Sequence, residues 1–233
     1  MNILAIDTSD ARGSVCVLRE SQTIALRAHQ TNADYSEWLL PAVNEVLRTS
    51  SLGMEDLDLL AVSTGPGSFT GLRVGLTTVK AWAEVYGLPV GGVSRLEGIA
   101  SRSRGEAGLI AAFYDAQRGQ LFGGLYRKCD GKVENVEDEM VIAPEGFFDW
   151  VGARAGEMRV NWVSLDPDLI TGLAGWGRRL ELGDGIERCA PELAVEIGSV
   201  AETRAREGIF SDPLALDANY VRRSDAEIFW KGR

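Results

Sequence analysis

The sequence predicts an α/β fold made of two similar lobes, each a mixed β-sheet flanked by helices. Strand-like apolar runs alternate with helical patterns along most of the chain. In addition, the opening ILAIDTSDARGSVCVLRE resembles the later segment IAAFYDAQRGQLFGGLYRK, and their alignment places Asp7 against Asp115. Each aspartate ends an apolar strand and precedes a turn that contains Arg and Gly. We therefore expect a duplicated lobe, residues 1–104 and 105–233, with a cleft between the copies.

The first half opens with consecutive apolar runs that are separated only by short polar turns, a pattern typical of neighbouring strands. Strands and helices then alternate, with glycine-rich segments between them. The expected strands are 2–7, 14–20, 23–29, 58–63 and 89–94, and the expected helices are 33–50, 72–87 and 95–104.

The second half opens with the long strand, turn and strand segment 109–128. Shorter apolar runs follow near 140–143, 159–165 and 169–171, and a helical pattern covers 191–208. The tail from residue 211 has no clear period. We expect it to be irregular and to lie back over the body of the protein.

Charge and composition limit the classes of function. The 233 residues are 45% apolar, which is enough for a sizeable core. Because 24 Lys and Arg oppose 34 Asp and Glu, the net charge is −10 and the surface should repel nucleic acid. We therefore expect any nucleic-acid substrate to be held by another molecule.

Cysteine and histidine usage argues against a metal site. The three cysteines, Cys16, Cys129 and Cys189, are far apart and form no CxxC, so we expect reduced thiols. The single histidine, His29, excludes sites that need two imidazoles. The start has no basic leader and no run of about 18 apolar residues occurs, so we expect a cytoplasmic protein without a membrane contact.

The segment TGPGSFTGLR is the most unusual stretch of the chain. It is not a phosphate-binding P-loop, because no Lys follows its last Gly. It is not a nucleophile elbow either, because it lacks G-x-S-x-G and His29 would be the only base. We interpret it as a structural corner with a helix cap at Ser68 or Thr70, and anion binding at the helix start stays open. The corner consists of Gly65, Pro66, Gly67, Ser68, Thr70 and Gly71.

A duplicated lobe with an aspartate after the first strand of each half resembles the actin-like superfamily of ATPases and sugar kinases. In that superfamily the two aspartate turns hold metal and phosphates. The resemblance implies that the first turn, through Asp7, Thr8 and Ser9, and the second, through Asp115, are the positions for a nucleotide contact. Both turns carry few glycines, so the backbone cradle for phosphate is poor and nucleotide turnover is not expected.

Four segments resemble one particular family. MNILAIDTS, YSEWLLPAVNEVL, STGPGSFTGLRVGL and YVRRSDAE are similar to the TsaB (YeaZ) family over essentially the whole chain. The resemblance implies an accessory subunit without a catalytic residue or metal of its own. It would pair with TsaD, which transfers threonylcarbamoyl to the adenosine next to the tRNA anticodon, and would work with TsaE. It would meet tRNA only through the complex, and ATP or ADP at the complex interface stays open.

Two predicted helices carry more apolar surface than one sheet contact requires. From the residues alone, both could be core helices. The family resemblance instead implies that they pack against TsaD, or against a second copy when TsaD is absent. The expected interface residues are Tyr35, Trp38, Leu39, Ala42, Val46, Leu72, Leu76 and Val79. Tyr35 departs from the family, many members of which have a histidine before the LLP.

Three classes of function remain open from the sequence. The first is a non-catalytic partner that activates TsaD. The second is an enzyme, either an actin-like ATPase that uses Asp7 and Asp115 or, with less support, a peptidase. The third is a structural protein that only self-associates.

Overall fold

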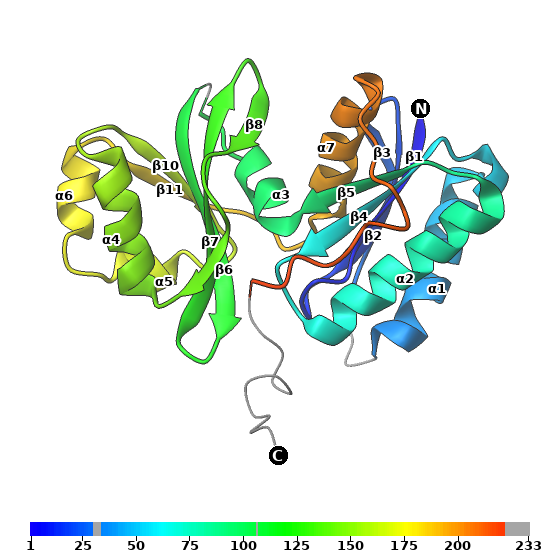
Figure 1. Ribbon diagram of the computed structural model, residues 1–233, viewed down its shortest axis with the longest axis horizontal. Coiled ribbons are helices and arrows are strands. Elements are labelled where there is room, and N and C mark those ends of the chain that lie inside the picture. Colours follow the sequence, from blue (N-terminus) through cyan, green and yellow to red (C-terminus); the bar gives the residue numbers. More distant parts are fainter. Residues whose placement is uncertain (30–33, 106, 222–233) are drawn as a thin grey trace.

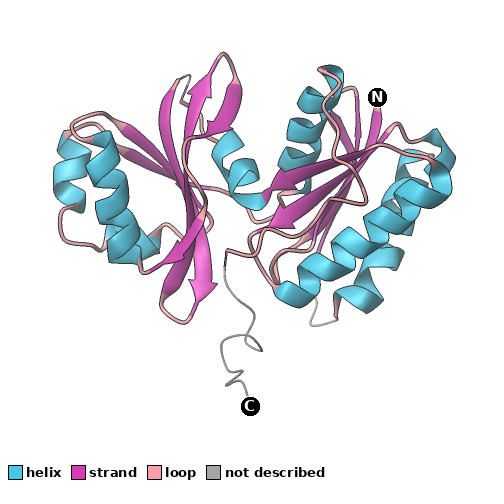
Figure 2. Cartoon of the chain, in the orientation of Figure 1, coloured by secondary structure: helices cyan, strands magenta, loops and turns pink. Residues whose placement is uncertain are grey.

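A computed structural model describes residues 1–29, 34–105 and 107–221 of the chain. It contains two β-sheets, each with helices on its outer face, and two further helices between the sheets (Figures 1 and 2). The strands are rich in buried Val, Ile, Leu and Ala, because both faces of each sheet are covered.

The first sheet has the strand order β3-β2-β1-β4-β5. Its strands are β1 (Asn2–Asp7), β2 (Ser14–Arg19), β3 (Gln22–Ala28), β4 (Leu59–Gly65) and β5 (Val90–Ser94). β1 pairs antiparallel with β2 and parallel with β4, and Asp7 lies opposite Ser14 at the end of the β1–β2 hairpin.

The second sheet has the order β11-β10-β6-β7-β8, with the short β9 also paired to β7. Its strands are β6 (Gly108–Gln117), β7 (Gln120–Cys129), β8 (Lys132–Asn135), β9 (Met140–Ile142), β10 (Val160–Ser164) and β11 (Gly185–Arg188). β6 pairs antiparallel with β7 and parallel with β10.

The two sheets repeat one topology. In each, the first strand forms a hairpin with the second. The first strand also lies parallel to a later strand, β4 or β10, which in turn lies parallel to the last strand, β5 or β11. The aspartates Asp7 and Asp115 occupy the same place, near the end of the first strand of each sheet. The predicted duplicated α/β fold is therefore confirmed.

Helices α1 (Tyr35–Ser50) and α2 (Phe69–Tyr86) cover the outer face of the first sheet (Figure 1). Their apolar residues recur three and four positions apart and join one core with β1, β2 and β4. Each helix ends at a residue with left-handed backbone, Ser51 and Gly87. A single 3₁₀ turn, Met54–Asp56, leads into β4.

Helices α4 (Pro144–Ala155), α5 (Asp168–Thr171) and α6 (Trp176–Glu181) cover the outer face of the second sheet. An aromatic group that includes Phe113, Phe147, Trp162 and Trp176 fills this core. The sequence pattern did not predict α4, whose buried face is only Phe147, Val151 and Ala155.

Helices α3 (Arg95–Ser101) and α7 (Ala194–Arg206) lie between the two sheets and cross over between the halves of the sequence (Figure 2). α3 follows the first sheet but packs mainly on β6, β7 and β8, whereas α7 follows the second sheet and packs on β1, β2, β4 and β5. A boundary at residue 104 therefore marks where the second sheet begins, but each lobe is completed by a helix from the other half.

The described part of the tail runs along the first lobe. Ser211 forms a β-bridge with Val90, and the Asn219 N–H donates to the carbonyl of Thr64 at 2.7 Å. Leu216 and Ala218 pack against the core that α1 and α2 share with the sheet. The rest of the tail, 222–233, lies outside the described residues.

Candidate functional site

A cleft with a volume of about 740 Å³ lies between the two hairpin turns that carry Asp7 and Asp115. Residues of the β1–β2 turn, the glycine loop, the β6–β7 turn, the segment after β10 and the tail line it. The sequence analysis predicted a nucleotide contact at these two turns. The polar side chains around this cleft therefore decide what it can bind.

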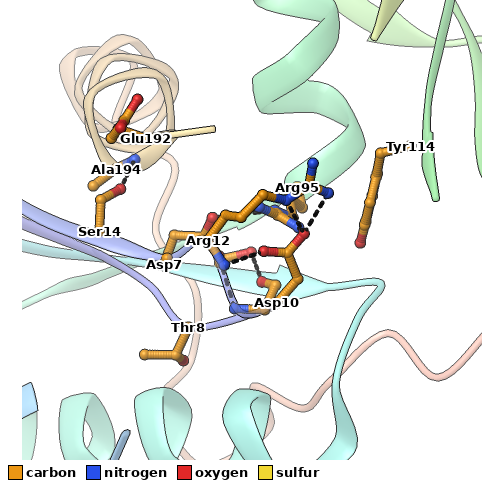
Figure 3. A network of polar contacts seen from close by, with 12 residues as sticks. Asp7, Thr8, Asp10, Arg12, Ser14, Arg95, Tyr114, Glu192 and Ala194 are labelled. Atoms are coloured by element: carbon orange, nitrogen blue, oxygen red, sulfur yellow. Dashed lines mark hydrogen bonds and ion pairs between the residues drawn. The ribbon is translucent and has the colours of Figure 1, made fainter. Parts of the chain in front are cut away.

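Asp7 is fully buried and does not face the cleft as a free carboxylate. Its Oδ2 accepts from Nε of Arg95 at 3.1 Å, and its Oδ1 accepts from the Ser9 N–H at 2.9 Å. Arg95 is also completely buried and lies between Asp7 and Tyr114 (Figure 3). Both carboxylate oxygens of Asp7 therefore already have a partner within the chain.

Asp10 and Arg12 extend this ionic cluster along the β1–β2 turn. Asp10 Oδ2 lies 2.7 Å from Nη1 of Arg95 and 2.8 Å from Nη2 of Arg12. Burial alone would raise the pKa of Asp10, but the two guanidinium groups outweigh it and hold the pKa well below its usual range. Asp10 therefore stays ionised and paired at any physiological pH.

Thr8 and Ser9 are buried and bonded to the glycine loop. Thr8 Oγ1 donates to the carbonyl of Gly71 at 2.7 Å, and the Ser9 carbonyl accepts from the Ser68 N–H at 2.6 Å. Ser9 Oγ also lies 2.6 Å from Ser63 Oγ of β4. Together with the ion pair of Asp7, these contacts engage the side chains of Asp7, Thr8 and Ser9 within the chain itself, and a nucleotide contact through this turn stays a prediction.

The glycine loop packs tightly against the β1–β2 turn. A Cβ added to Gly67 would lie 2.2 Å from the carbonyl oxygen of Ser9, and one added to Gly71 would lie 2.1 Å from that of Thr8. Only glycine allows this close approach. Ser68, rather than Thr70, is the N-cap of α2, and its Oγ accepts from the Gly71 N–H at 3.3 Å. Gly65 has a φ of 97°, and the Gly65–Pro66 bond is cis.

Asp115 in the second turn differs from Asp7, because it is only half-buried and lines the cleft. Its carboxylate accepts from the N–H of Gln117 at 2.7 Å and from the Gln117 side-chain amide at 2.9 Å. Its own N–H donates to Asp166 Oδ2 at 2.9 Å. A contact between Asp115 and a nucleotide stays a prediction.

Acidic side chains outnumber basic ones in the lining of the cleft. Asp10, Asp115 and Asp166 line it together with Arg12 and Arg118, and the Arg12 guanidinium is already paired with two of these carboxylates. Within the described part of the chain, no group of three or more His, Cys, Asp or Glu side chains is arranged to hold a metal ion. No helix there is long and apolar enough to cross a membrane.

The helix pair α1 and α2 has a buried and an exposed side. The buried side holds most of the predicted interface residues, namely Leu39, Ala42, Val46, Leu72, Leu76 and Val79, each at most 5% exposed. These six side chains belong to the chain's own core, and a role for them in an interface stays a prediction. Tyr35 and Trp38 are half-buried at the start of α1.

A shallow groove of about 420 Å³ runs between the exposed sides of α1 and α2. Leu40, which is 52% exposed, is its most exposed large apolar residue. The groove, called here the helix-pair groove, is lined by Tyr35, Ser36, Leu39, Leu40, Arg73, Val74, Thr77 and Thr78. Among these residues, Tyr35 and Arg73 are of the types that are enriched at protein interfaces.

The sequence analysis did not identify Arg95, Arg12 and Asp166 as site residues. Arg95 did carry a local signal, since it is the first residue of α3, where the helix dipole disfavours a cation. An arginine in that place requires acidic partners. Nothing local identifies those partners as Asp7 and Asp10, which come from the other end of the lobe's sequence.

Comparisons with solved structures define the class of the fold. YeaZ from Pseudomonas aeruginosa superposes with a TM-score of 0.74 at 23% identity, covering 94% of this chain and 99% of that one. The ROK hexokinase from Thermus thermophilus gives a TM-score of 0.55 at 12% identity, covering 88% and 100% of the two chains. The chain therefore has the duplicated actin-like fold that sugar kinases also use.

Sequence comparisons give the family. Residues 26–160 match the family described as TsaD, tRNA N6-adenosine threonylcarbamoyltransferase. The tRNA threonylcarbamoyladenosine biosynthesis protein TsaB of Bacillus subtilis (strain 168) is 39% identical over 151 residues, 65% of each chain. TsaB of Escherichia coli (strain K12) is 31% identical over 180 residues, 76% of this chain and 74% of that one. The chain belongs to the TsaB (YeaZ) family.

Proposed function

We propose that this chain is a non-catalytic subunit of the machinery that makes threonylcarbamoyladenosine in tRNA, and that it acts by binding and activating TsaD. The observation that carries the proposal is the contrast between its two candidate sites. The carboxylates of the first turn are neutralised by Arg95 and Arg12, whereas the helix-pair groove leaves apolar surface uncovered. Relatives named for threonylcarbamoyladenosine biosynthesis support the process.

The ionic cluster supports a role without nucleotide turnover. An actin-like ATPase needs its first-turn aspartate free to organise metal and phosphate, but Asp7 is fully buried against Arg95. The acidic surface, with a net charge of −10, supports a contact with tRNA only through other subunits. TsaE would join the same complex, and a homodimer through the same groove is the competing use of this surface.

A drop-out reconstitution tests the proposal. Transfer RNA, threonine, bicarbonate, ATP and the TsaC, TsaD and TsaE proteins of the same organism are incubated with and without this chain, and the modified adenosine is measured by mass spectrometry. We expect product to be lost when the chain is omitted. Undiminished product without the chain would contradict the proposed role.

The groove is tested with a matched pair of variants. Leu40 and Leu180 are leucines on helices with nearly the same exposure, 52% and 51%, but Leu180 lies on α6 of the other lobe. We expect Leu40→Glu to lose binding to TsaD and Leu180→Glu to keep it. If Leu40→Glu binds TsaD normally but fails to self-associate, the groove serves a homodimer instead.

A further inference from the structure

We infer that ionic and aromatic contacts of this chain, in part fully buried, hold its two lobes at one fixed angle without any ligand. These contacts, called here the lobe latch, join Asp7, Asp10 and Arg12 of the first sheet's lobe to Tyr114 and Asp166 of the second sheet's lobe, with Arg95 of α3 between them. The inference concerns the chain alone and does not depend on the proposed binding to TsaD.

Arg12 forms the outer part of the lobe latch. Its Nη1 lies 2.9 Å from Asp166 Oδ1 and its Nη2 lies 3.2 Å from Asp166 Oδ2, while Nη2 and Nε also bond to Asp10. Arg12 belongs to the β1–β2 turn, and Asp166 follows β10 of the other sheet. A planar guanidinium between two carboxylates fixes both distance and orientation, because its paired N–H groups match carboxylate geometry.

Asp166 carries the contact on to the second hairpin turn. Its Oδ2 also accepts from the Asp115 N–H at 2.9 Å, and its own N–H donates to Ser164 Oγ at 2.8 Å. The Asp166 carboxylate thus connects the two duplicated turns, because it contacts Arg12 in the first turn and the Asp115 N–H in the second.

Arg95 forms the inner part of the lobe latch. Its guanidinium lies between the carboxylates of Asp7 and Asp10 and the ring of Tyr114, whose centroid is 4.6 Å from its Cζ (Figure 3). The Tyr114 hydroxyl donates to the carbonyl of Pro66 in the first lobe. Burial raises the pKa of Tyr114, so the hydroxyl keeps its proton and remains a donor.

Tyr35 positions the turn that carries the latch. Its hydroxyl donates to the carbonyl of Asp10 and accepts from the Gly13 N–H at 2.9 Å, and thereby fixes both ends of the segment that contains Arg12. His29 packs on the Tyr35 ring with centroids 4.5 Å apart. Since Tyr35 also lines the helix-pair groove, the start of α1 is connected to the lobe latch.

These contacts have a common consequence. Two-lobed proteins commonly close around a ligand by a hinge motion. Here the carboxylates on the two sides, Asp10 and Asp166, share Arg12, and the fully buried Arg95 leaves the interior of the contact without access for solvent. The side chains of the lobe latch therefore hold the two lobes together without a ligand.

Distance measurements between spin labels test the inference. Labels are placed on α1 through Asn44→Cys and on α4 through Asp149→Cys, with the exposed Cys129 changed to Ser. For the wild-type latch we expect one narrow distance distribution that ATP or ADP with Mg²⁺ does not change. Arg12→Ala should shift the distribution to longer distances and broaden it.

Matched variants make the result decisive. Arg27→Ala removes an ion pair of similar type that lies within one lobe, to Glu45 at 3.2 Å, and should leave the distribution unchanged. Asp166→Asn keeps an acceptor for the Asp115 N–H but loses the charge that pairs with Arg12. We expect it to lengthen and broaden the distance distribution as well, and it replaces Arg12→Ala if the Arg12 variant does not fold. Distributions that match the wild type in both latch variants, or a wild type that narrows only with nucleotide, would overturn the inference.

Discussion

The cleft between the lobes and the groove between α1 and α2 differ in which groups they leave without a partner. Around the cleft, charged side chains are paired with each other, and several of them are buried. In the groove, an aliphatic side chain, Leu40, stands exposed beside Thr77 and Arg73. Carboxylates that are already paired gain little from a ligand, whereas exposed apolar surface gains free energy when a partner covers it.

A duplicated fold can keep its topology while the chemistry of its cleft changes. The two hairpin turns still face each other across a cleft, as the shared topology requires. One arginine at the start of α3 nevertheless engages both carboxylates of the first turn, since it forms ion pairs with Asp7 and Asp10. The overall fold is thus a weak guide to chemistry, and the pairing of individual side chains is a strong one.

Removal of Arg95 is the largest change that we expect to measure. Arg95→Met leaves Asp7 buried without its cation, and loss of one partner of a buried ion pair costs about 3–5 kcal/mol. Urea unfolding followed by tryptophan fluorescence measures this loss. Arg27→Ala, which breaks an exposed ion pair, should change the stability by less than about 1 kcal/mol. An Arg95→Met protein as stable as the wild type would contradict the claim that the buried ion pairs beside the cleft stabilise the fold.

Leu40→Glu in the groove should have the next largest effect, on binding and not on folding. A central contact residue contributes about 1.4–2.8 kcal/mol, so the affinity for TsaD should fall about tenfold to hundredfold. Isothermal titration calorimetry measures it, with Leu180→Glu as the control of equal exposure. Equal affinities of the two variants for TsaD would contradict the proposal that the helix-pair groove binds TsaD.

Glu139 offers a smaller, pH-dependent effect at the junction of the lobes and the tail. Its carboxylate accepts from Ser94 of the first lobe, Tyr126 of the second lobe and the Asn219 amide of the tail. Burial raises the pKa of Glu139 in the folded protein above the value of 4.5 for an unperturbed glutamate. The folded state therefore favours the protonated form.

The sign of the pH effect follows from linkage. The stability that Glu139 contributes through protonation is present below its unfolded pKa and is lost as the pH rises through its folded pKa. Glu139→Gln loses one acceptor, which costs about 0.5–1.5 kcal/mol at low pH, and this deficit should shrink as the pH rises. Urea unfolding of both proteins from pH 5 to pH 8 measures the difference. A deficit that grows with pH would contradict the raised pKa.

We expect nucleotide to leave the Tm of the isolated chain unchanged, which is the smallest of these effects. A ligand present at about 100 times its dissociation constant would stabilise the fold by about 2.7 kcal/mol. Because the first-turn carboxylates are paired with arginines, we expect no change in Tm with millimolar ATP or ADP and Mg²⁺. A clear rise in Tm that Asp115→Asn abolishes would show that the cleft still binds nucleotide.

The sequence predicted the strands and their duplication because these rest on local patterns. Apolar runs and an aspartate turn recur in both halves, and the two sheets follow them. The crossing of α3 and α7 was not predictable, since an apolar helix face does not say which sheet it covers. α4 was missed because its buried face is short.

The candidate site shows the same limit more sharply. Asp7 was recognised from its position after β1, but its partner Arg95 lies 88 residues later in the chain. The apolar residues of α1 and α2 were recognised too, yet their pattern alone does not separate the core residue Leu39 from the exposed Leu40 next to it. Burial and pairing are decided by tertiary contacts, which a single sequence does not contain.

The most direct test of the central claim compares one variant from each region in the reconstituted modification reaction. Leu40→Glu changes the groove, and Asp115→Asn changes the cleft-facing aspartate that an ATPase of this fold would require. We predict that Leu40→Glu loses most of the modified adenosine and that Asp115→Asn keeps it at the wild-type level. Full activity of Leu40→Glu together with loss of activity in Asp115→Asn would contradict the account and place the function in the cleft.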